Sequence, residues 1–159
     1  MTEAATEVVL RQVVVRAPQQ KAFEVFTGRF NDIKPRDHTL LSSPIAETVL
    51  EPRVGGRIYD RAEDGTEFAW ARVLAFEPPD RLVFSWDIGV QWELETDPAN
   101  ASEVEVRFIA EAPDRTRVEL EHRHLDRHGP GWRALIDQLG NDQGWPLYLS
   151  RFAALFGEG

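Results

Sequence analysis

The residues best suited to acid–base chemistry lie in the run HRHLDRH, which begins at His122. Histidine titrates close to neutral pH, so His122 could act as a general acid or base. In a β-strand residues i and i+2 share a face, so His122 and His124 could also chelate a metal ion. The strand pattern ends near His124, however, and the spacing fixes no third ligand. We therefore interpret His122 as a core or cavity-lining histidine and expect no metal site.

Arg72 is the second chemically informative residue, because the alternate positions around it are apolar or aromatic. A buried arginine needs a partner, since removing its charge from water is costly. Its guanidinium could bind a ligand carboxylate or phenolate. There are two alternatives to ligand binding: Arg72 could pair with an internal Asp or Glu, or its face of the strand could be solvated. Arg57 and Arg61 share a face with Tyr59 and raise the same question.

These residues belong to three successive alternating segments, 57–61, 66–76 and 81–86, which are rich in aromatic side chains. Asp64-Gly65 and Pro78-Pro79-Asp80 supply turn chemistry at the joints, so the segments are predicted to form antiparallel strands. Alternation places Phe68, Trp70, Arg72, Leu74 and Phe76 on one face, and Leu82, Phe84 and Trp86 on another. The same side chains would form either a solid core or an aromatic-walled cavity.

Further strands are predicted at 8–16, 45–51, 102–112 and 116–125. One helix is predicted from Pro18, in its first turn, to Gly28, and a second at 132–139. A third is predicted from Asn141 or Asp142 onward, with Pro146 in its first turn. The last helix carries an apolar stripe of Trp145, Leu149, Phe152 and Phe156, flanked by Tyr148 and Leu155. Segment 89–100 is a connection or an edge strand. Residues 29–44 are predicted to form a long loop, either irregular throughout or with one short helical turn. A loop of this length in a compact domain is more often functional than not.

Composition limits the kinds of partner. The 159 residues are expected to form a single domain, 1–159, with residues 1–6 frayed. A net charge of −9 argues against nucleic acid and against anionic membrane surfaces. Cysteine is absent, which excludes thiolate chemistry and disulfides. The sequence shows no signal peptide or apolar span, so a cytoplasmic location is expected.

Motifs for a nucleophile elbow, a phosphate loop or a dinucleotide site are missing, so we expect no cofactor and assign no catalytic residue. Glutamates such as Glu103 and Glu105 alternate with apolar residues. This pattern is typical of a solvated sheet face rather than of a catalytic carboxylate pair.

The order of short motifs resembles bacterial proteins similar to the C-terminal domain of the activator of Hsp90 ATPase, within the START/Bet v 1-like superfamily. The motifs are Gly55-Gly56, Asp64-Gly65, the turn at 78–82, Trp86, the strand TRVELEH at 116–122, Gly131-Trp132 and Gly144-Trp145-Pro146. The family often has a tryptophan-rich stretch where this chain has residues 29–38. The resemblance implies an α+β helix-grip fold: a curved antiparallel sheet of six to seven strands around a long C-terminal helix, with short helices after the first strand.

The resemblance and the aromatic faces together predict a non-enzymatic binder of a small hydrophobic molecule, aromatic or lipid-like, in a cavity between sheet and C-terminal helix. The predicted ligand-binding residues are Tyr59, Trp70, Arg72, Phe84, Trp86, His122, Trp145, Leu149 and Phe152. One alternative is a polyketide cyclase or dehydratase, which needs an acid/base pair in the cavity, for example His122 with Arg72 or Tyr59. Another is a protein-interaction module with a chaperone partner. A homodimer is also possible.

Overall fold

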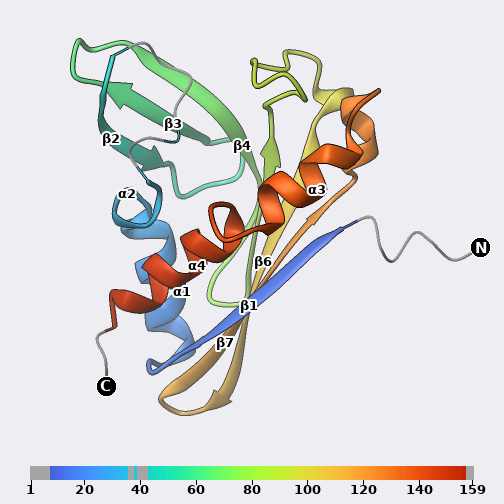
Figure 1. Cartoon of the computed structure of the whole chain (residues 1–159). Helices are drawn as coiled ribbons and strands as arrows, with labels where there is room; N and C mark the ends of the chain where they lie inside the picture. Colours follow the sequence, from blue (N-terminus) through green and yellow to red (C-terminus); the bar gives the residue numbers. More distant parts are fainter. Residues whose placement is uncertain (1–7, 36–37, 39–42, 157–159) are drawn as a thin grey trace, which may run out of the picture.

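A computed structural model describes residues 8–35, 38 and 43–156, and it consists of one curled antiparallel sheet with helices on its inner face (Figure 1). The strands are β1 (Val9–Val15), β2 (Ile45–Leu50), β3 (Arg57–Ala62), β4 (Glu67–Glu77), β5 (Arg81–Trp86), β6 (Ser102–Ala112) and β7 (Arg115–Arg123). The helices are α1 (Gln19–Gly28), α2 (Phe30–Ile33), α3 (Arg133–Gly140) and α4 (Trp145–Ala154), with 3-10 turns η2 (Pro98–Asn100) and η3 (Leu125–His128). None of the helices in the described part of the chain is long and apolar enough to cross a membrane.

The sheet has the order β1-β7-β6-β5-β4-β3-β2, so consecutive strands from β2 to β7 are neighbours. The first strand closes the other edge by pairing with β7, where Val13 lies opposite Val118. Figure 1 shows α4 lying across this sheet, with α1 and α2 beside the C-terminal end of α4. The helix-grip fold predicted from the sequence is therefore confirmed, and the strands begin and end within about two residues of their predicted bounds.

The central strand β4 departs from simple alternation at two β-bulges. Its pairing with β3 skips Trp70, and its pairing with β5 skips Leu74. Because an extra residue at a bulge resets the alternation, Trp70, Ala71 and Val73 all pack inward. The prediction that Arg72 and Leu74 share the face of Trp70 is wrong for this reason. Their side chains lie on the outer face, where Leu74 is 38% exposed.

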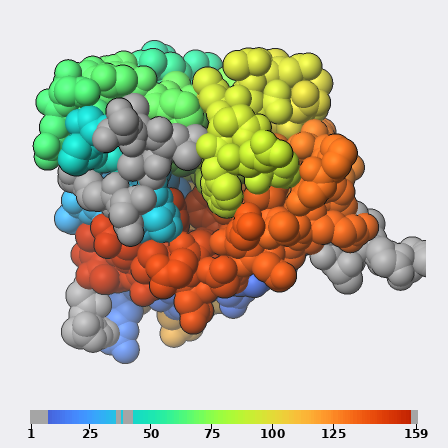
Figure 2. Space-filling view, turned by 45° about the horizontal axis from the view of Figure 1, so that its top comes forward, coloured from blue at the N-terminus to red at the C-terminus, as the bar shows by residue number. Residues whose placement is uncertain are grey.

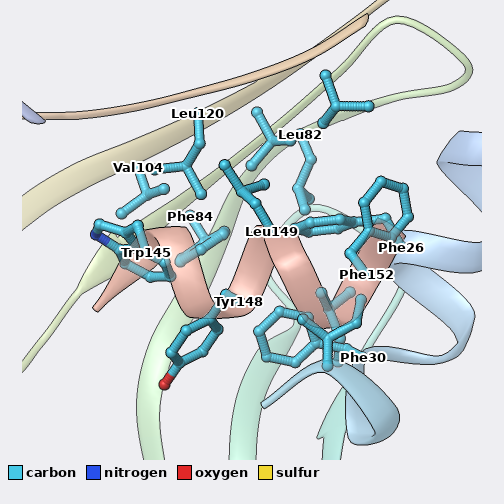
Figure 3. Packing of buried hydrophobic residues seen from close by; sticks show 14 of the residues in the cluster. Phe26, Phe30, Leu82, Phe84, Val104, Leu120, Trp145, Tyr148, Leu149 and Phe152 are labelled. Atoms are coloured by element: carbon cyan, nitrogen blue, oxygen red, sulfur yellow. The ribbon is translucent and has the colours of Figure 1, made fainter. Parts of the chain in front are cut away.

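The core lies between the inner face of the sheet and α1, α2 and α4. Figure 3 shows Leu82, Phe84, Val104 and Leu120 of the sheet facing Trp145, Leu149 and Phe152 of α4. Around Phe26 the rings meet edge to face, with centroids 5.2 Å from Phe152 and 5.7 Å from Phe108. The predicted apolar stripe of the last helix is thus buried, and Phe84, Leu149 and Phe152 belong to the solid part of the core.

Two loops take one of the forms predicted for them. Segment 29–44 contains the short helix α2, and His38 of the same segment belongs to the described residues. Segment 89–100 forms no strand, and its pairing is limited to a bridge between Ile88 and Leu94.

Strand β7 ends at Arg123, because His124 adopts a left-handed conformation with φ 62°. In the described part of the chain no group of His, Asp or Glu side chains could hold a metal ion.

The outer face of the sheet carries charges arranged in pairs. Glu105 is bound by Arg81 at 2.7 Å, by Arg107 at 3.2 Å and by Arg123. Burial works to raise the pKa of Glu105, but hydrogen bonds from Arg123 and Arg81 outweigh it and lower the pKa. The face predicted to be solvated is therefore an ion-pair network rather than a set of free carboxylates.

Candidate ligand-binding site

A partly open pocket of about 380 Å³ lies between the strands β3 to β5 and the connection from α3 to α4. Its lining residues are Lys34, His38, Asp60, Phe68, Trp70, Trp86, Ile88, Trp92, Gln138, Leu139, Gln143, Gly144, Trp145 and Tyr148. Four of the five tryptophans of the chain are among them. Figure 2 shows the segment after β5, coloured yellow-green, resting against α3 in orange on this side of the molecule.

Asp60 forms the centre of a polar end of the pocket. It is 1% exposed and accepts hydrogen bonds from Thr48 Oγ1 at 2.7 Å and from Trp70 Nε1 at 3.3 Å. The ammonium group of Lys34 lies 3.3 Å from the other carboxylate oxygen, and Lys34 is 4% exposed. A buried ion pair is tolerated only when further hydrogen bonds satisfy its members. Here Thr48 and Trp70 supply them for Asp60, and the carbonyl of His38 accepts from Lys34.

His38 and Tyr148 form the second polar pair of the pocket. The imidazole Nδ1 lies 3.1 Å from the Tyr148 hydroxyl. Tyr148 projects from the first turns of α4, where its ring centroid lies 4.9 Å from that of Trp145. Lys34 and His38 both come from the loop at 29–44, which the sequence predicted to be functional. This loop is also where the chain departs from the tryptophan-rich pattern of the family that it resembles.

His122 lies behind the aromatic wall and is fully buried. Its Nδ1 accepts a hydrogen bond of 3.1 Å from Trp145 Nε1, and its Nε2 lies 2.7 Å from Ser102 Oγ. The same serine oxygen lies 2.7 Å from His128 Nε2. Burial, together with the nearby His128, lowers the pKa of His122 to about 3. His122 is therefore a neutral core histidine, as one of the two interpretations from the sequence had it.

The predicted site residues separate into three groups. Trp70, Trp86 and Trp145 line the pocket together. Phe84, His122, Leu149 and Phe152 lie in the core outside the pocket lining.

Tyr59 and Arg72 are on the outer face of the sheet. The guanidinium of Arg57 covers the ring of Tyr59 at 4.3 Å, while Arg72 pairs with both carboxylate oxygens of Asp87 at 3.0 and 3.1 Å. This pair raises the pKa of Arg72. The internal ion pair was one of the alternatives for this residue.

Sequence reasoning did not identify Lys34, His38 and Asp60 as site residues. A signal for Asp60 was present, since it falls between Ile58 and Ala62 in an alternating strand and so places a carboxylate on an apolar face. Lys34 and His38 had no comparable signal, because nothing in a loop sequence shows where its side chains point.

The model of the family described as Activator of Hsp90 ATPase homolog 1-like protein matches residues 16–157. A solved structure described as "An anthrahydroquino-Gama-pyrone synthase Txn09 complexed with SUM" is 42% identical, with 93% of this chain and 96% of that chain covered and a TM-score of 0.64. The self-sacrificing resistance protein CalC from Micromonospora echinospora is 31% identical, with coverages of 95% and 94% and a TM-score of 0.67. A search of curated proteins found no match.

Proposed function

The chain belongs to the Activator of Hsp90 ATPase homolog 1-like family, and we propose that its pocket binds a flat, polycyclic aromatic molecule. The observation that carries this proposal is the pocket wall, in which four tryptophans, Phe68 and Tyr148 surround about 380 Å³. Apolar and aromatic walls with a few convergent polar groups are the usual form of a small-molecule site. Indole and phenol rings also stack well on other rings.

The polar end of the pocket favours a ligand with oxygen atoms along one edge. Lys34 brings an ammonium group and Tyr148 a hydroxyl group to the lining. Both can donate hydrogen bonds to a phenolate, an enolate or a quinone carbonyl. Hydroxylated quinones of the polyketide type combine such an edge with a flat apolar body. The description of Txn09 as an anthrahydroquino-γ-pyrone synthase names a product of related chemistry.

A second candidate function is closure of an oxygen heterocycle on such a molecule. Two observations favour it: the 42% identity to a pyrone synthase, and the His38–Tyr148 pair at the pocket. In a closure of this kind a hydroxyl oxygen attacks an unsaturated carbon, so a base must accept the hydroxyl proton and a donor must stabilise the enolate oxygen. His38 is suited to the first role, and Lys34 or Tyr148 to the second.

The acid/base pair that the sequence suggested for an enzyme, His122 with Arg72 or Tyr59, does not lie in the pocket. His38 with Tyr148 takes its place in this proposal. CalC shares the fold, and its description is that of a resistance protein, so the fold alone does not choose between binding and catalysis. A cytoplasmic location, a homodimer and a chaperone partner remain predictions from the sequence.

The binding proposal is tested by titrating the protein with 1,4-dihydroxyanthraquinone and following tryptophan fluorescence and heat. Trp70→Leu removes part of the wall, and Arg72→Ala is its matched control because it lies two residues away on the opposite face. We expect Trp70→Leu to weaken the affinity by about tenfold or more, since stacking and burial of one ring contribute about 1–3 kcal/mol, and Arg72→Ala to leave it unchanged. Equal effects of the two variants, or no binding by the unaltered chain, would refute the proposal.

The catalytic candidate needs a separate readout. A hydroxyaryl ynone, whose closure to a pyrone is an isomerisation, is incubated with the protein, and the isomeric product is followed by chromatography. His38→Gln should lower the rate of closure while the affinity for 1,4-dihydroxyanthraquinone changes little. Tyr148→Phe should lower both the rate and the affinity, because its hydroxyl also donates to the bound molecule. If both variants close the ring as fast as the unaltered chain, the His38–Tyr148 pair is not the acid/base pair.

A further inference from the structure

Trp145 lines the pocket and also makes a hydrogen bond into the core behind it. This residue begins α4 and is 2% exposed. Its ring packs against those of Trp86 and Tyr148, with centroid distances of 5.6 and 4.9 Å. Figure 3 shows its indole nitrogen pointing away from the ring of Tyr148. One edge of Trp145 thus faces the pocket wall, while its polar edge is directed into the core.

The hydrogen bonds behind Trp145 have a fixed direction. An indole N–H can only donate, so Nδ1 of His122 must be the acceptor at 3.1 Å. A neutral imidazole then carries its proton on Nε2, which donates to Ser102 Oγ at 2.7 Å. The hydroxyl of Ser102 is left to donate to Nε2 of His128, also at 2.7 Å. The chain therefore runs from Trp145 through His122 and Ser102 to His128, with each group donating to the next.

The far end of this chain is a buried polar atom of His128. If Nε2 of His128 accepts from Ser102, the proton of His128 lies on Nδ1. That atom is buried and has no hydrogen-bond partner among the described residues. Burial lowers the pKa of His128, and the nearby Glu95, Asp87 and Glu93 only partly oppose this effect. Burial thus favours the neutral form of both histidines, which is the form that the direction of the chain requires.

We propose that His122 is a positioning residue, which holds the Trp145 ring in place and through it the Tyr148 hydroxyl beside His38. Ser102 and His128 act one step further away, by keeping the proton of His122 on Nε2 so that Nδ1 stays an acceptor. The effect on ligands rests on the proposed function, whereas the effect on Trp145 and Tyr148 does not.

A catalytic role for the Ser102–His122–His128 group is excluded by its position. Ser102 and His122 are both fully buried, and neither lines the pocket. The indole of Trp145 stands between His122 and the cavity, and an indole does not relay protons at ordinary pH. The group can therefore act on a ligand only by fixing the ring in front of it.

The test compares two polar replacements of His122 that differ in where they place an oxygen. Asparagine places its amide oxygen near the position of Nδ1, so it can still accept the hydrogen bond from Trp145. Glutamine places its amide group near the position of Nε2, so it can reach Ser102 but not accept from Trp145 at the same time. His122→Leu removes both bonds. Phe108→Leu is the control for loss of core packing, because Phe108 contacts Phe23 and Phe26 far along the sheet from His122.

The first readout is nuclear magnetic resonance without any ligand. The indole N–H signal of Trp145, assigned with Trp145→Phe, and the ring signals of Tyr148 are recorded for each variant. We expect both to move in His122→Gln, to stay near their original positions in His122→Asn, and to be unaffected by Phe108→Leu. If His122→Leu does not fold, the Asn and Gln pair still decides the result.

The second readout is the affinity for 1,4-dihydroxyanthraquinone. We expect His122→Gln to weaken it by about tenfold, the scale of one hydrogen bond, and His122→Asn to restore most of that loss. Unchanged Trp145 and Tyr148 signals in His122→Gln, or equal losses of affinity in His122→Gln and Phe108→Leu, would overturn the positioning role. If the unaltered chain fails to bind the probe, the proposed function fails by itself, and the ligand-free signals still decide this inference.

Discussion

Replacing Asp60 with asparagine should destabilise the protein strongly, because it leaves the ammonium of Lys34 buried without the carboxylate 3.3 Å away. Lys34 is 4% exposed and Asp60 is 1% exposed, so water cannot replace the carboxylate in solvating the ammonium group of Lys34. Asparagine has nearly the same shape and keeps one oxygen that can accept from Thr48. The change therefore isolates the charge of Asp60 from its packing.

The magnitude follows from the burial of the pair. Removing one member of a buried ion pair costs about 3–5 kcal/mol. Because the asparagine oxygen still satisfies Thr48, we place Asp60→Asn at the lower limit, about 3 kcal/mol. With a urea dependence of about 2 kcal/mol per molar, the unfolding midpoint falls by about 1.5 M. The melting temperature falls by about 6–12 °C for a chain of this size.

The assay is equilibrium unfolding in urea, with Asp87→Asn as the matched control. Asp87 pairs with Arg72 on the outer face, where Arg72 is 38% exposed and can regain water, so the control should lose only about 1 kcal/mol. The double variant Lys34→Met with Asp60→Asn removes both charges and should recover at least half of the loss. If Asp60→Asn costs no more than Asp87→Asn, or if the double variant is worse than Asp60→Asn alone, the assignment of a buried charge pair is refuted.

Two further predictions concern the wall of the pocket. The pKa of His122 lies at about 3 in the folded protein and near 6.5 in the unfolded chain, so the unfolded chain binds a proton first as the pH falls. The contribution of His122 to stability is therefore complete above about pH 6.5 and declines toward pH 3, by up to about 1.4 kcal/mol per pH unit. Urea unfolding midpoints measured across this range should decline less steeply for His122→Asn. A Cβ at Gly144 would lie 2.1 Å from the carbonyl oxygen of Leu139, so Gly144→Ala should cost about 1–3 kcal/mol and displace the start of α4, whereas Gly28→Ala, whose Cβ meets nothing within 4 Å, should not destabilise in the same thermal assay.

The sequence predicted the sheet and the last helix because both have strong periodic patterns. Alternation in 102–112 and 116–123 places every second residue inward, and the structure has β6 and β7 there without a shift at their centres. The stripe from Trp145 to Phe152 has helical spacing and is buried. Trp70, Trp86 and Trp145 could be identified as wall residues for the same reason.

The same reasoning placed Arg72 wrongly because periodicity cannot show a β-bulge. At Trp70 one residue of β4 has no partner in β3, and at Leu74 one has none in β5. Up to Trp70 the side chains that point inward belong to even-numbered residues. Between the two bulges they belong to the odd-numbered Ala71 and Val73. The segment Ala69 to Leu74 is apolar at every position except Arg72, so it fits both phases equally well, and only the pairing with the neighbouring strands decides which face Arg72 takes.

The two halves of the pocket therefore have different origins. The aromatic wall comes from the sheet and α4, whose periodic patterns also form the core, so changing it costs stability. Lys34 and His38 come from an irregular loop, while Asp60 stands at the pocket end of β3. Loops tolerate substitution better than the elements that they connect. Substitution at His38 can therefore change the polar groups of the pocket while the aromatic wall is retained. The fold that this chain shares with the synthase Txn09 and the resistance protein CalC does not by itself fix the chemistry of the pocket.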